Sequence, residues 1–262
     1  MSITDQFLLG LQAYQEIQAE IPQKEDVPFA NKKAHRYEVV EARTIPLPKE
    51  SLLLGLGEDG SPLMLDVYDS APGPLLVAGD GGSGKTAFLK SLAQASDQQS
   101  PGEIQFGVIT PFPEEWTEQE ALSNCLGIWP AYHMAARDFL TQLIGWADSP
   151  HGSHQVVLLL VDGLDLLTAC DFQIQHELRW LLMYGPERRA WPVVTVNPGR
   201  LTHLQTWLDY FKTRILGQVK RPQTTRLLIK DPEINLATLE AGTQFGLSRP
   251  GGWLKFRLTP ID

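Results

Sequence analysis

The chain has little cysteine, no long apolar run and no excess of basic charge. Its 262 residues include two cysteines, Cys125 and Cys170. Two are too few for the disulfide framework of a small secreted domain, so we expect two reduced, buried thiols. No stretch of about 18 consecutive apolar residues is present, which predicts that no transmembrane helix is encoded. The first residues also lack the basic and apolar regions of a secretory signal. These absences predict a cytoplasmic protein without a membrane segment.

The charge balance is acidic, with 31 Asp and Glu against 22 Lys and Arg and a formal net charge of −9. A dedicated nucleic-acid binder usually has a basic face, so this balance disfavours one, although it does not exclude a local basic channel. The hydrophobic fraction of 43% is enough for a sizeable core. The length suits one large α/β domain or one domain with an appendage.

One segment carries a chemical motif. Residues 79–86 are GDGGSGKT and match G-x-x-x-x-G-K-[ST], the phosphate-binding P-loop. Its glycines let successive backbone N–H groups turn toward a phosphate chain. Lys85 would reach the β- and γ-phosphates, and the Thr86 hydroxyl would hold Mg²⁺. A helix starting near Lys85 would add its positive N-terminal end. The predicted nucleotide-binding residues are Gly79, Asp80, Gly81, Gly82, Ser83, Gly84, Lys85, Thr86 and Ala87.

The pattern around this loop predicts an α/β fold. A short apolar run at 74–78 predicts a buried strand entering the loop, and apolar spacing at 87–93 predicts a helix leaving it. Downstream, predicted strands and helices alternate, which favours right-handed crossovers and a mainly parallel sheet flanked by helices. Asp-Gly between two apolar runs predicts a preceding β-hairpin. We expect strands at 37–42, 51–57, 62–67, 104–110, 156–161, 192–196 and 214–218, a closing hairpin at 244–247 and 253–258, and helices at 114–122, 132–147, 173–183 and 201–211.

A second element of a nucleotide site follows the apolar run at 156–161. Six apolar residues predict a central strand buried on both faces, and Asp162 stands at its carboxyl end, where α/β sheets bind ligands. Asp162 would therefore orient Mg²⁺. The residue after it is Gly163, where many hydrolysing motors carry Glu. Asp165 is a candidate substitute, or simply an N-terminal residue of the next helix.

The first 36 residues are expected to form a separate appendage. Apolar residues at intervals of three and four predict an amphipathic helix over 3–21, and a polar, proline-containing linker follows at 22–36. The helix either packs on its own domain or docks a partner. The main domain would then span 37–262.

These segments together resemble the FtsK/HerA class of P-loop ATPases. The hairpin 54–66 (LGLGEDGSPLMLD) and the lead 71–79 (APGPLLVAG) are similar to the segments that precede the loop in FtsK domains. Residues 194–198 (VTVNP), 213–216 (TRIL) and 246–252 (GLSRPGG) resemble the sensor strand, the next strand and the closing hairpin. Residues 161–167 (VDGLDLL) are similar to ATPase domains of type VII secretion proteins. The resemblance implies a RecA/FtsK-like sheet, ATP and Mg²⁺ as cofactors, a homo-oligomeric ring, and a DNA or protein substrate that is translocated.

The departures from the family pattern share a direction. Gly163 replaces the catalytic Glu, and Val196 and Asn197 replace the Gln and Arg of the sensor strand. Because such residues act mainly on the transition state, we predict nucleotide binding with weak or conditional hydrolysis. A neighbouring subunit of a ring could supply an arginine finger. The candidates, which are otherwise surface charges, are Arg188, Arg189, Arg214 and Arg221.

Two other function classes remain as alternatives. In the first, the domain is a catalytically degenerate ATP-binding adaptor or regulatory module, which the altered catalytic positions favour. In the second, it is a small-molecule kinase or a GTPase, but neither an Asn-Lys-x-Asp motif nor an arginine-rich lid is evident. The proposed site residues are Lys85, Asp162 and Asp165 for catalysis, with Thr86 and Asp162 holding Mg²⁺.

Overall fold

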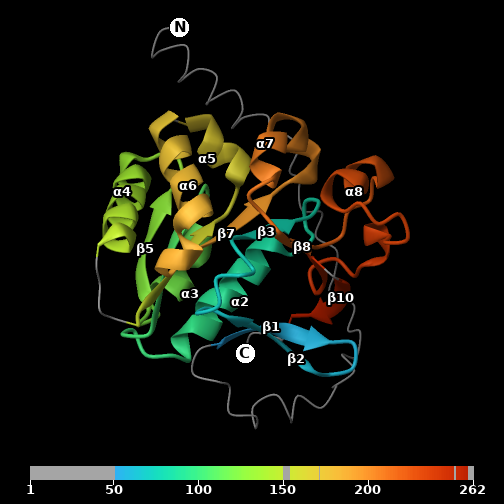
Figure 1. Cartoon of the computed structure of the whole chain (residues 1–262), viewed down its shortest axis with the longest axis horizontal. Coiled ribbons are helices and arrows are strands. Elements are labelled where there is room, and N and C mark those ends of the chain that lie inside the picture. Colours follow the sequence, from blue (N-terminus) through green and yellow to red (C-terminus); the bar gives the residue numbers. More distant parts are fainter. Residues whose placement is uncertain (1–50, 150–153, 171, 251, 259–262) are drawn as a thin grey trace, which may run out of the picture. The chain divides into compact units, whose positions relative to one another are not determined.

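Ten strands form one mixed sheet in the computed structural model, which describes residues 51–149, 154–170, 172–250 and 252–258. The strands are β1 Ser51–Gly57, β2 Pro62–Asp66, β3 Leu75–Ala78, β4 Ile104–Thr110, β5 Cys125–Pro130, β6 Val156–Val161, β7 Ala190–Val196, β8 Thr213–Leu216, β9 Gln244–Arg249 and β10 Gly252–Arg257. Their order across the sheet is β2-β1-β10-β9-β8-β3-β7-β6-β4-β5. Figure 1 shows how the labelled strands and helices are arranged. The helix expected at 3–21, the linker at 22–36 and the strand at 37–42 lie outside the described residues.

Six of the ten strands form a parallel block, in the order β8, β3, β7, β6, β4 and β5. Every residue of β6 and β7 is buried. This burial on both faces explains their continuous apolar sequences, because helices cover both sides of a parallel sheet. The predicted α/β class with a mainly parallel sheet is confirmed.

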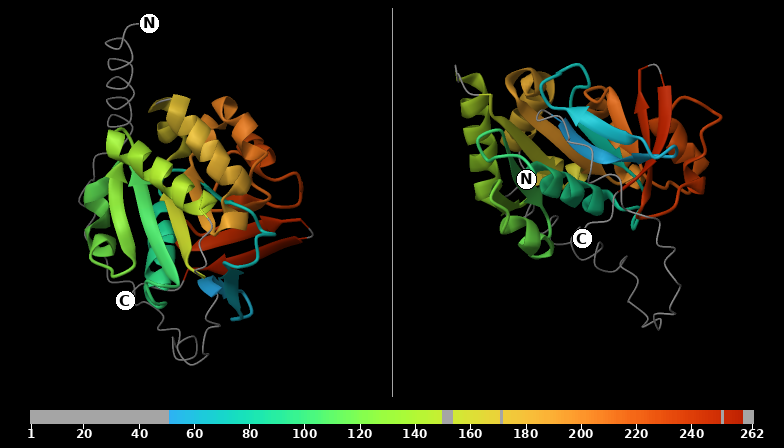
Figure 2. Two further views of the ribbon diagram at one scale, coloured as in Figure 1. Left: turned by 60° about the vertical axis from the view of Figure 1, so that its left-hand side comes forward. Right: turned by 90° about the horizontal axis from the view of Figure 1, so that it is seen from below.

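Helices cover the two faces of the parallel block unequally (Figure 2). The helices of the fold are α2 Lys85–Asp97, α3 Thr117–Glu120, α4 Met134–Asp148, α5 Leu164–Cys170, α6 Phe172–Tyr184, α7 Gln205–Leu208 and α8 Pro222–Leu228. Alternation along β3 separates two cores, because successive side chains of a strand point to opposite faces. Leu76 and Ala78 join the core under α4, α5, α6 and α7, while Leu75 and Val77 join the core under α2.

The other end of the sheet is antiparallel. The β9–β10 hairpin pairs with β8, and the β1–β2 hairpin pairs with β10. Both hairpins are where the sequence predicts them. Trp191 of β7 ties the start of the chain's described part to the parallel block, because its buried indole N–H donates to the Val67 carbonyl at 2.7 Å. No helix among the described residues is long and apolar enough to span a membrane.

Several predicted elements differ from the structure. The helix expected at 114–122 is a 3₁₀ turn, Pro113–Trp116, followed by the short α3, and the helix expected at 201–211 is a 3₁₀ segment, Pro198–His203, followed by α7. Strand β5, which contains Gly127 and Pro130, and the seven-residue helix α8 were not predicted. Helix α5 agrees with the alternative interpretation of Asp165 as an N-terminal helix residue. Cys125 of β5 is a half-buried free thiol, and burial raises its pKa.

Candidate nucleotide-binding site

The P-loop lies between β3 and α2, as predicted, and its shape depends on glycine. Gly84 has a φ of +94° and forms the N-cap of α2. A Cβ at this position would lie 2.8 Å from the Gly242 backbone. Left-handed backbone and close backbone contact are both conditions that glycine alone meets without strain. The fourth glycine of the motif is therefore required by the geometry and not only by the pattern.

Hydrogen-bond donors collect at the start of α2. Gly84 makes no side-chain capping bond, and no acidic residue stands in the first turn of this 13-residue helix. The first N–H groups of a helix have no partner within the helix and carry its positive end. Ser83 adds a buried hydroxyl without a hydrogen-bond partner among the described residues. This set of donors suits the oxygens of a phosphate group.

Lys85 folds back over the loop. Its ammonium donates to the carbonyls of Gly79 at 2.7 Å and Asp80 at 3.0 Å. Burial lowers the pKa of Lys85, and the carboxylates of Asp162, Asp80 and Asp165 oppose this shift. The side chain is thus a half-buried cation held by two weak acceptors, which phosphate oxygens would replace with stronger, charge-assisted bonds.

Asp162 is held by two hydroxyls. Its Oδ2 accepts from the Thr86 hydroxyl at 2.8 Å, and its Oδ1 accepts from the Thr195 hydroxyl at 2.8 Å. The Thr195 oxygen in turn accepts from the Gly163 N–H at 2.8 Å. The sheet order explains this meeting, because Thr86 follows β3, Asp162 follows β6, and β7 with Thr195 lies between them. A hydroxyl and a carboxylate side by side fit Mg²⁺, which binds few protein oxygens and completes its shell with phosphate and water.

Thr195 is a site residue that the sequence reasoning missed. Its side chain is 1% exposed and carries the one hydroxyl of β7. A lone hydroxyl at the carboxyl end of an otherwise apolar strand was the available signal. Val196, which stands where the family pattern has the sensor Gln, is fully buried in the core. Asn197 is exposed, and its side chain accepts from the Gly199 N–H at 3.0 Å, which caps the following 3₁₀ segment.

Asp165 lies in the first turn of α5 and is ion-paired. Its Oδ2 lies 2.9 Å from the guanidinium of Arg200, with 13% of the Asp165 side chain and 40% of the Arg200 side chain exposed. Gly163, which separates Asp162 from α5, has a φ of +107°. Asp165 therefore shares the site with Lys85 and Asp162, but its carboxylate is committed to a cation.

Segments far along the chain support the loop. The Asp80 carboxylate accepts from the Lys220 N–H at 2.8 Å, and the Asp80 N–H donates to the Gln218 carbonyl at 2.9 Å. On the other side, the Gly242 N–H donates to the Ser83 carbonyl at 3.2 Å. The residues after β8 and before β9 thus form part of the P-loop's walls, and no local sequence pattern indicates this.

The candidate finger arginines lie in three different settings. Arg214 donates to three backbone carbonyls, and burial lowers its pKa despite the nearby Asp209. Arg188 and Arg189 precede β7 and so lie at the edge of the sheet opposite the P-loop. The Arg189 guanidinium also packs over the Tyr68 ring. Arg221 is exposed at the start of α8.

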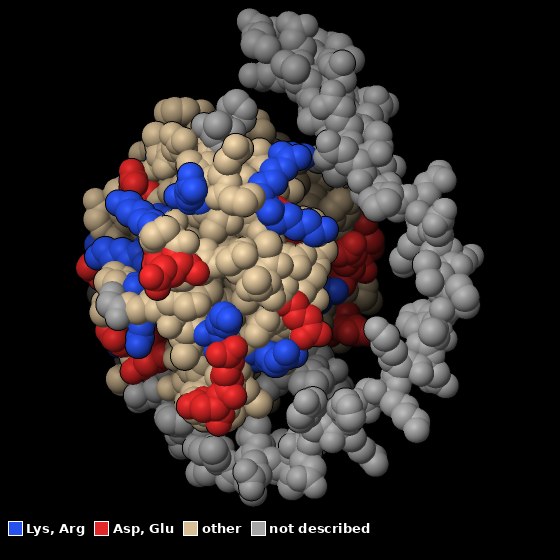
Figure 3. Space-filling model, turned by 90° about the vertical axis from the view of Figure 1, so that its right-hand side faces the viewer, with Lys and Arg blue, Asp and Glu red and all other residues tan. Residues whose placement is uncertain are grey.

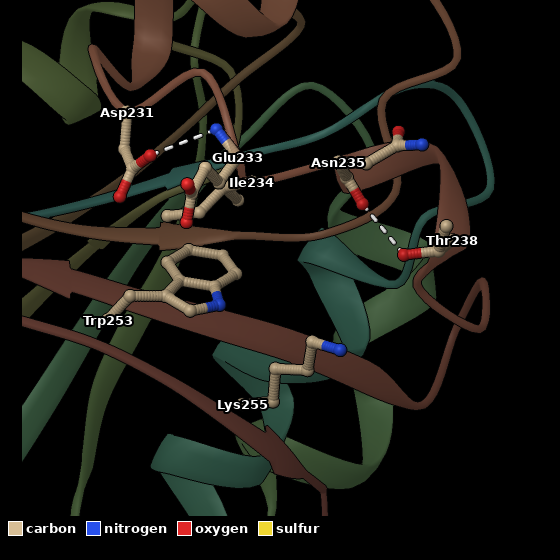
Figure 4. A pocket seen from close by; sticks show the side chains of 7 residues that line it. All are labelled: Asp231, Glu233, Ile234, Asn235, Thr238, Trp253 and Lys255. Atoms are coloured by element: carbon tan, nitrogen blue, oxygen red, sulfur yellow. Dashed lines mark hydrogen bonds between the residues drawn. The ribbon is translucent and has the colours of Figure 1, made fainter.

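A pocket of about 330 Å³ lies elsewhere, between the loop before β9 and strand β10 (Figure 4). The Trp253 indole forms its floor and lies against Gly246, where a Cβ would be 1.8 Å from the ring. Glu233 stands over one side of the ring, and Lys255 lies on the other (Figure 4). This pocket shares no residue with the P-loop, so it provides no evidence for the nucleotide site.

Comparisons with known proteins agree with this geometry. The NACHT domain family matches residues 73–230. A DNA translocase FtsK from Corynebacterium glutamicum is 31% identical over 103 residues, which are 38% of this chain and 11% of that protein.

Solved structures share the fold. The cytoplasmic domain of the Thermomonospora curvata type VII secretion ATPase EccC has a TM-score of 0.64 at 17% identity, over 82% of this chain and 29% of that one. The pCW3 conjugation coupling protein TcpA, in monomer form with ATPγS, has a TM-score of 0.59 at 13% identity, over 82% of this chain and 68% of that one. The chain thus spans about a tenth of the FtsK relative and under a third of EccC. The chain belongs to the NACHT family of P-loop NTPases, and its fold is that of the ATPase domains in these solved structures.

Proposed function

We propose that the domain binds Mg-ATP at the P-loop and hydrolyses it slowly or only when a partner completes the site. The observation that carries this proposal is the Thr86–Asp162–Thr195 hydrogen-bond chain beside Lys85. The backbone N–H groups at the start of α2 and the Lys85 ammonium bind the β- and γ-phosphates. Thr86 and Asp162 hold Mg²⁺, and Thr195 fixes the direction of the Asp162 carboxylate. When bound, Mg²⁺ supplies charge neutralisation on the phosphates.

Slow hydrolysis follows from what surrounds the γ-phosphate position. Gly163 offers no side chain to orient water, Val196 is buried in the core, and Asn197 caps a helical turn. Asp165 holds the remaining carboxylate nearby, but this carboxylate already accepts a hydrogen bond from the Arg200 guanidinium. Loss of a water-orienting group lowers the rate without removing binding. We therefore expect turnover at least about 100-fold below the median enzyme rate of roughly 10 per second.

The proposed biological use is translocation of DNA or protein by a homo-oligomeric ring, since FtsK is a DNA translocase and EccC a secretion ATPase by name. On the face that carries α8 and β10, Lys and Arg alternate with Asp and Glu (Figure 3). A duplex-tracking surface would instead show one sign of charge. This observation favours protein over DNA on that face. The helix expected at 3–21 would dock a partner.

The alternative function, an ATP-binding adaptor, differs from the proposed ATPase only in that it would not hydrolyse ATP. Mg-ATP binding and steady-state hydrolysis should be measured for the wild type, for Lys85→Ala and for a control on the same helix, Lys90→Ala. The Lys90 ammonium packs over Trp116 and contacts the Glu115 carbonyl, so it reports general damage to α2.

We expect Lys85→Ala to abolish binding and Lys90→Ala to keep it. An ATP hydrolysis rate that rises with added polypeptide, or with added DNA in a salt-sensitive way, would identify a motor. A rate that neither addition raises would identify an adaptor. Phosphate transfer to a small acceptor would indicate a kinase instead. Rapid turnover by the isolated protein would contradict the slow-hydrolysis proposal, and absence of nucleotide binding would contradict the whole.

A further inference from the structure

The ion pair between Asp165 and Arg200 stands at the same edge of the sheet as the P-loop. Asp165 follows β6 by four residues, and Arg200 follows β7 by four. Strand β7 lies directly between β6 and β3, and β3 leads into the P-loop. Because parallel strands place their carboxyl ends together, the guanidinium and the carboxylate lie beside the phosphate-binding loop. The field of Asp165 at Lys85 agrees with this placement, since it opposes the fall in the pKa of Lys85.

The backbone after β7 holds Arg200 in this position. The Asn197 side chain accepts from the Gly199 N–H at 3.0 Å, and the Asn197 carbonyl accepts from the Arg200 N–H at 3.0 Å. Asn197 stands where the family pattern has an arginine, and it serves as the cap of a turn that presents an arginine three residues later. The turn therefore supplies a cation to the site from a position that alignment to the family pattern does not indicate.

The ion pair holds Arg200 on Asp165 in the absence of nucleotide, but it is weak enough for Arg200 to bind a phosphate instead. The Arg200 side chain is 40% exposed, so water screens the attraction and the guanidinium has room to turn. A γ-phosphate carries more negative charge than one carboxylate and accepts paired guanidinium hydrogen bonds. ADP lacks that group, so it offers Arg200 no better partner than Asp165.

We propose that Arg200 is the γ-phosphate sensor of this domain and that Asp165 is its resting partner. ATP draws Arg200 from Asp165 to the γ-phosphate, whereas ADP leaves the pair intact. The exchange makes Arg200 a specificity residue for triphosphate over diphosphate. It also makes Asp165 a positioning residue, which acts through Arg200: because ATP must compete with Asp165 for the guanidinium, the carboxylate lowers the affinity for ATP. This inference rests on the proposed Mg-ATP site.

The test is the ratio of ATPγS to ADP affinity of the full chain, measured by calorimetry with Mg²⁺. Arg200→Gln should weaken ATPγS binding roughly 10- to 100-fold, the range for a charge-assisted hydrogen bond, with ADP affinity unchanged within about twofold. Asp165→Asn should strengthen ATPγS binding about 2- to 5-fold, because water reaches the Arg200 side of the pair and screens its attraction. The double variant should match Arg200→Gln, since Asp165 acts only through Arg200. Arg200→Lys should restore part of the preference.

Arg188→Gln is the matched control. Arg188 is also ion-paired, with Asp148 at 3.6 Å, and its side chain is 37% exposed, but it lies at the opposite edge of the sheet. It should leave both affinities unchanged. ADP affinity reports whether each variant keeps its fold. If the wild type binds ATPγS through Lys85 and Arg200→Gln keeps the wild-type ratio, the sensor is refuted while the proposed function stands. If the wild type binds neither nucleotide, the proposed function itself fails.

Discussion

Removing the Thr195 hydroxyl isolates the contact that orients Asp162. Thr195→Val keeps the shape of the side chain but leaves Asp162 Oδ1 and the Gly163 N–H without their partner. A hydrogen bond to a charged group contributes about 1.5–3 kcal/mol, and a neutral one about 1 kcal/mol. Asp162 is only half-buried, so water replaces part of the first term. We therefore expect a loss of about 2 kcal/mol in the free energy of unfolding.

For a domain of this size, that loss lowers Tm by about 4–8 °C. The assay is urea unfolding together with nucleotide titration, each with Mg²⁺ and with EDTA. Mg-ATP affinity should fall about tenfold in Thr195→Val, since 1.4 kcal/mol is a factor of ten, and the fall should vanish without Mg²⁺. Thr195→Ser keeps the hydroxyl and should bind like the wild type. Equal damage from the Val and Ser variants would refute the reasoning, because the methyl group and not the hydroxyl would then be the important part.

Three further perturbations test the site and its frame. Gly84→Ala places a Cβ against the Gly242 backbone at a positive φ, so it should cost about 1–3 kcal/mol and abolish nucleotide binding. Gly145→Ala, in open space on α4, should stabilise the fold slightly, and a like loss in both variants would contradict the argument. Asn124→Leu removes a fully buried amide that donates to three backbone carbonyls, which should cost about 2–4 kcal/mol in urea unfolding, and a cost under about 1 kcal/mol would be incompatible with that role. The pKa of Lys85 is lower in the folded protein than in the unfolded chain, where it is about 10.4, so the unfolded chain binds more protons between these two values. As pH rises through this window, the free energy of unfolding of the wild type should therefore increase relative to that of Lys85→Met. Parallel pH profiles of unfolding for the two proteins would show that the cation is not desolvated.

The parts of the site that came from local rules were predictable. The P-loop is fixed by glycine geometry and by the strand and helix beside it, and β6 is marked by six apolar residues ending at Asp162. Both features are written in consecutive residues. For the same reason the two hairpins and most of the parallel strands were predicted within a few residues.

The parts that came from the meeting of distant segments were not predictable. Thr195 reaches Asp162 only because β7 lies between β3 and β6, and the sequence alone does not give this strand order. Arg200 belongs to no motif that the sequence analysis singled out, and its ion pair with Asp165 depends on the turn after β7. Gly242 follows β8 by many residues yet packs on Gly84. Sequence pattern identifies elements, whereas the contacts between elements decide which polar side chains become a site.

The strand order also has a consequence for synthesis. The β1–β2 hairpin leaves the ribosome before any other described strand, yet among the described strands it pairs with β10, which comes last of them in the sequence. The hairpin must therefore wait at the sheet's unfinished edge for almost the whole translation of the domain. Because β9 and β10 separate the hairpin from the P-loop strands in the sheet, the synthesis of β10, and not an early nucleus, should close the described sheet. Bound nucleotide could stabilise the parallel block during this wait, since every one of its strands precedes β9.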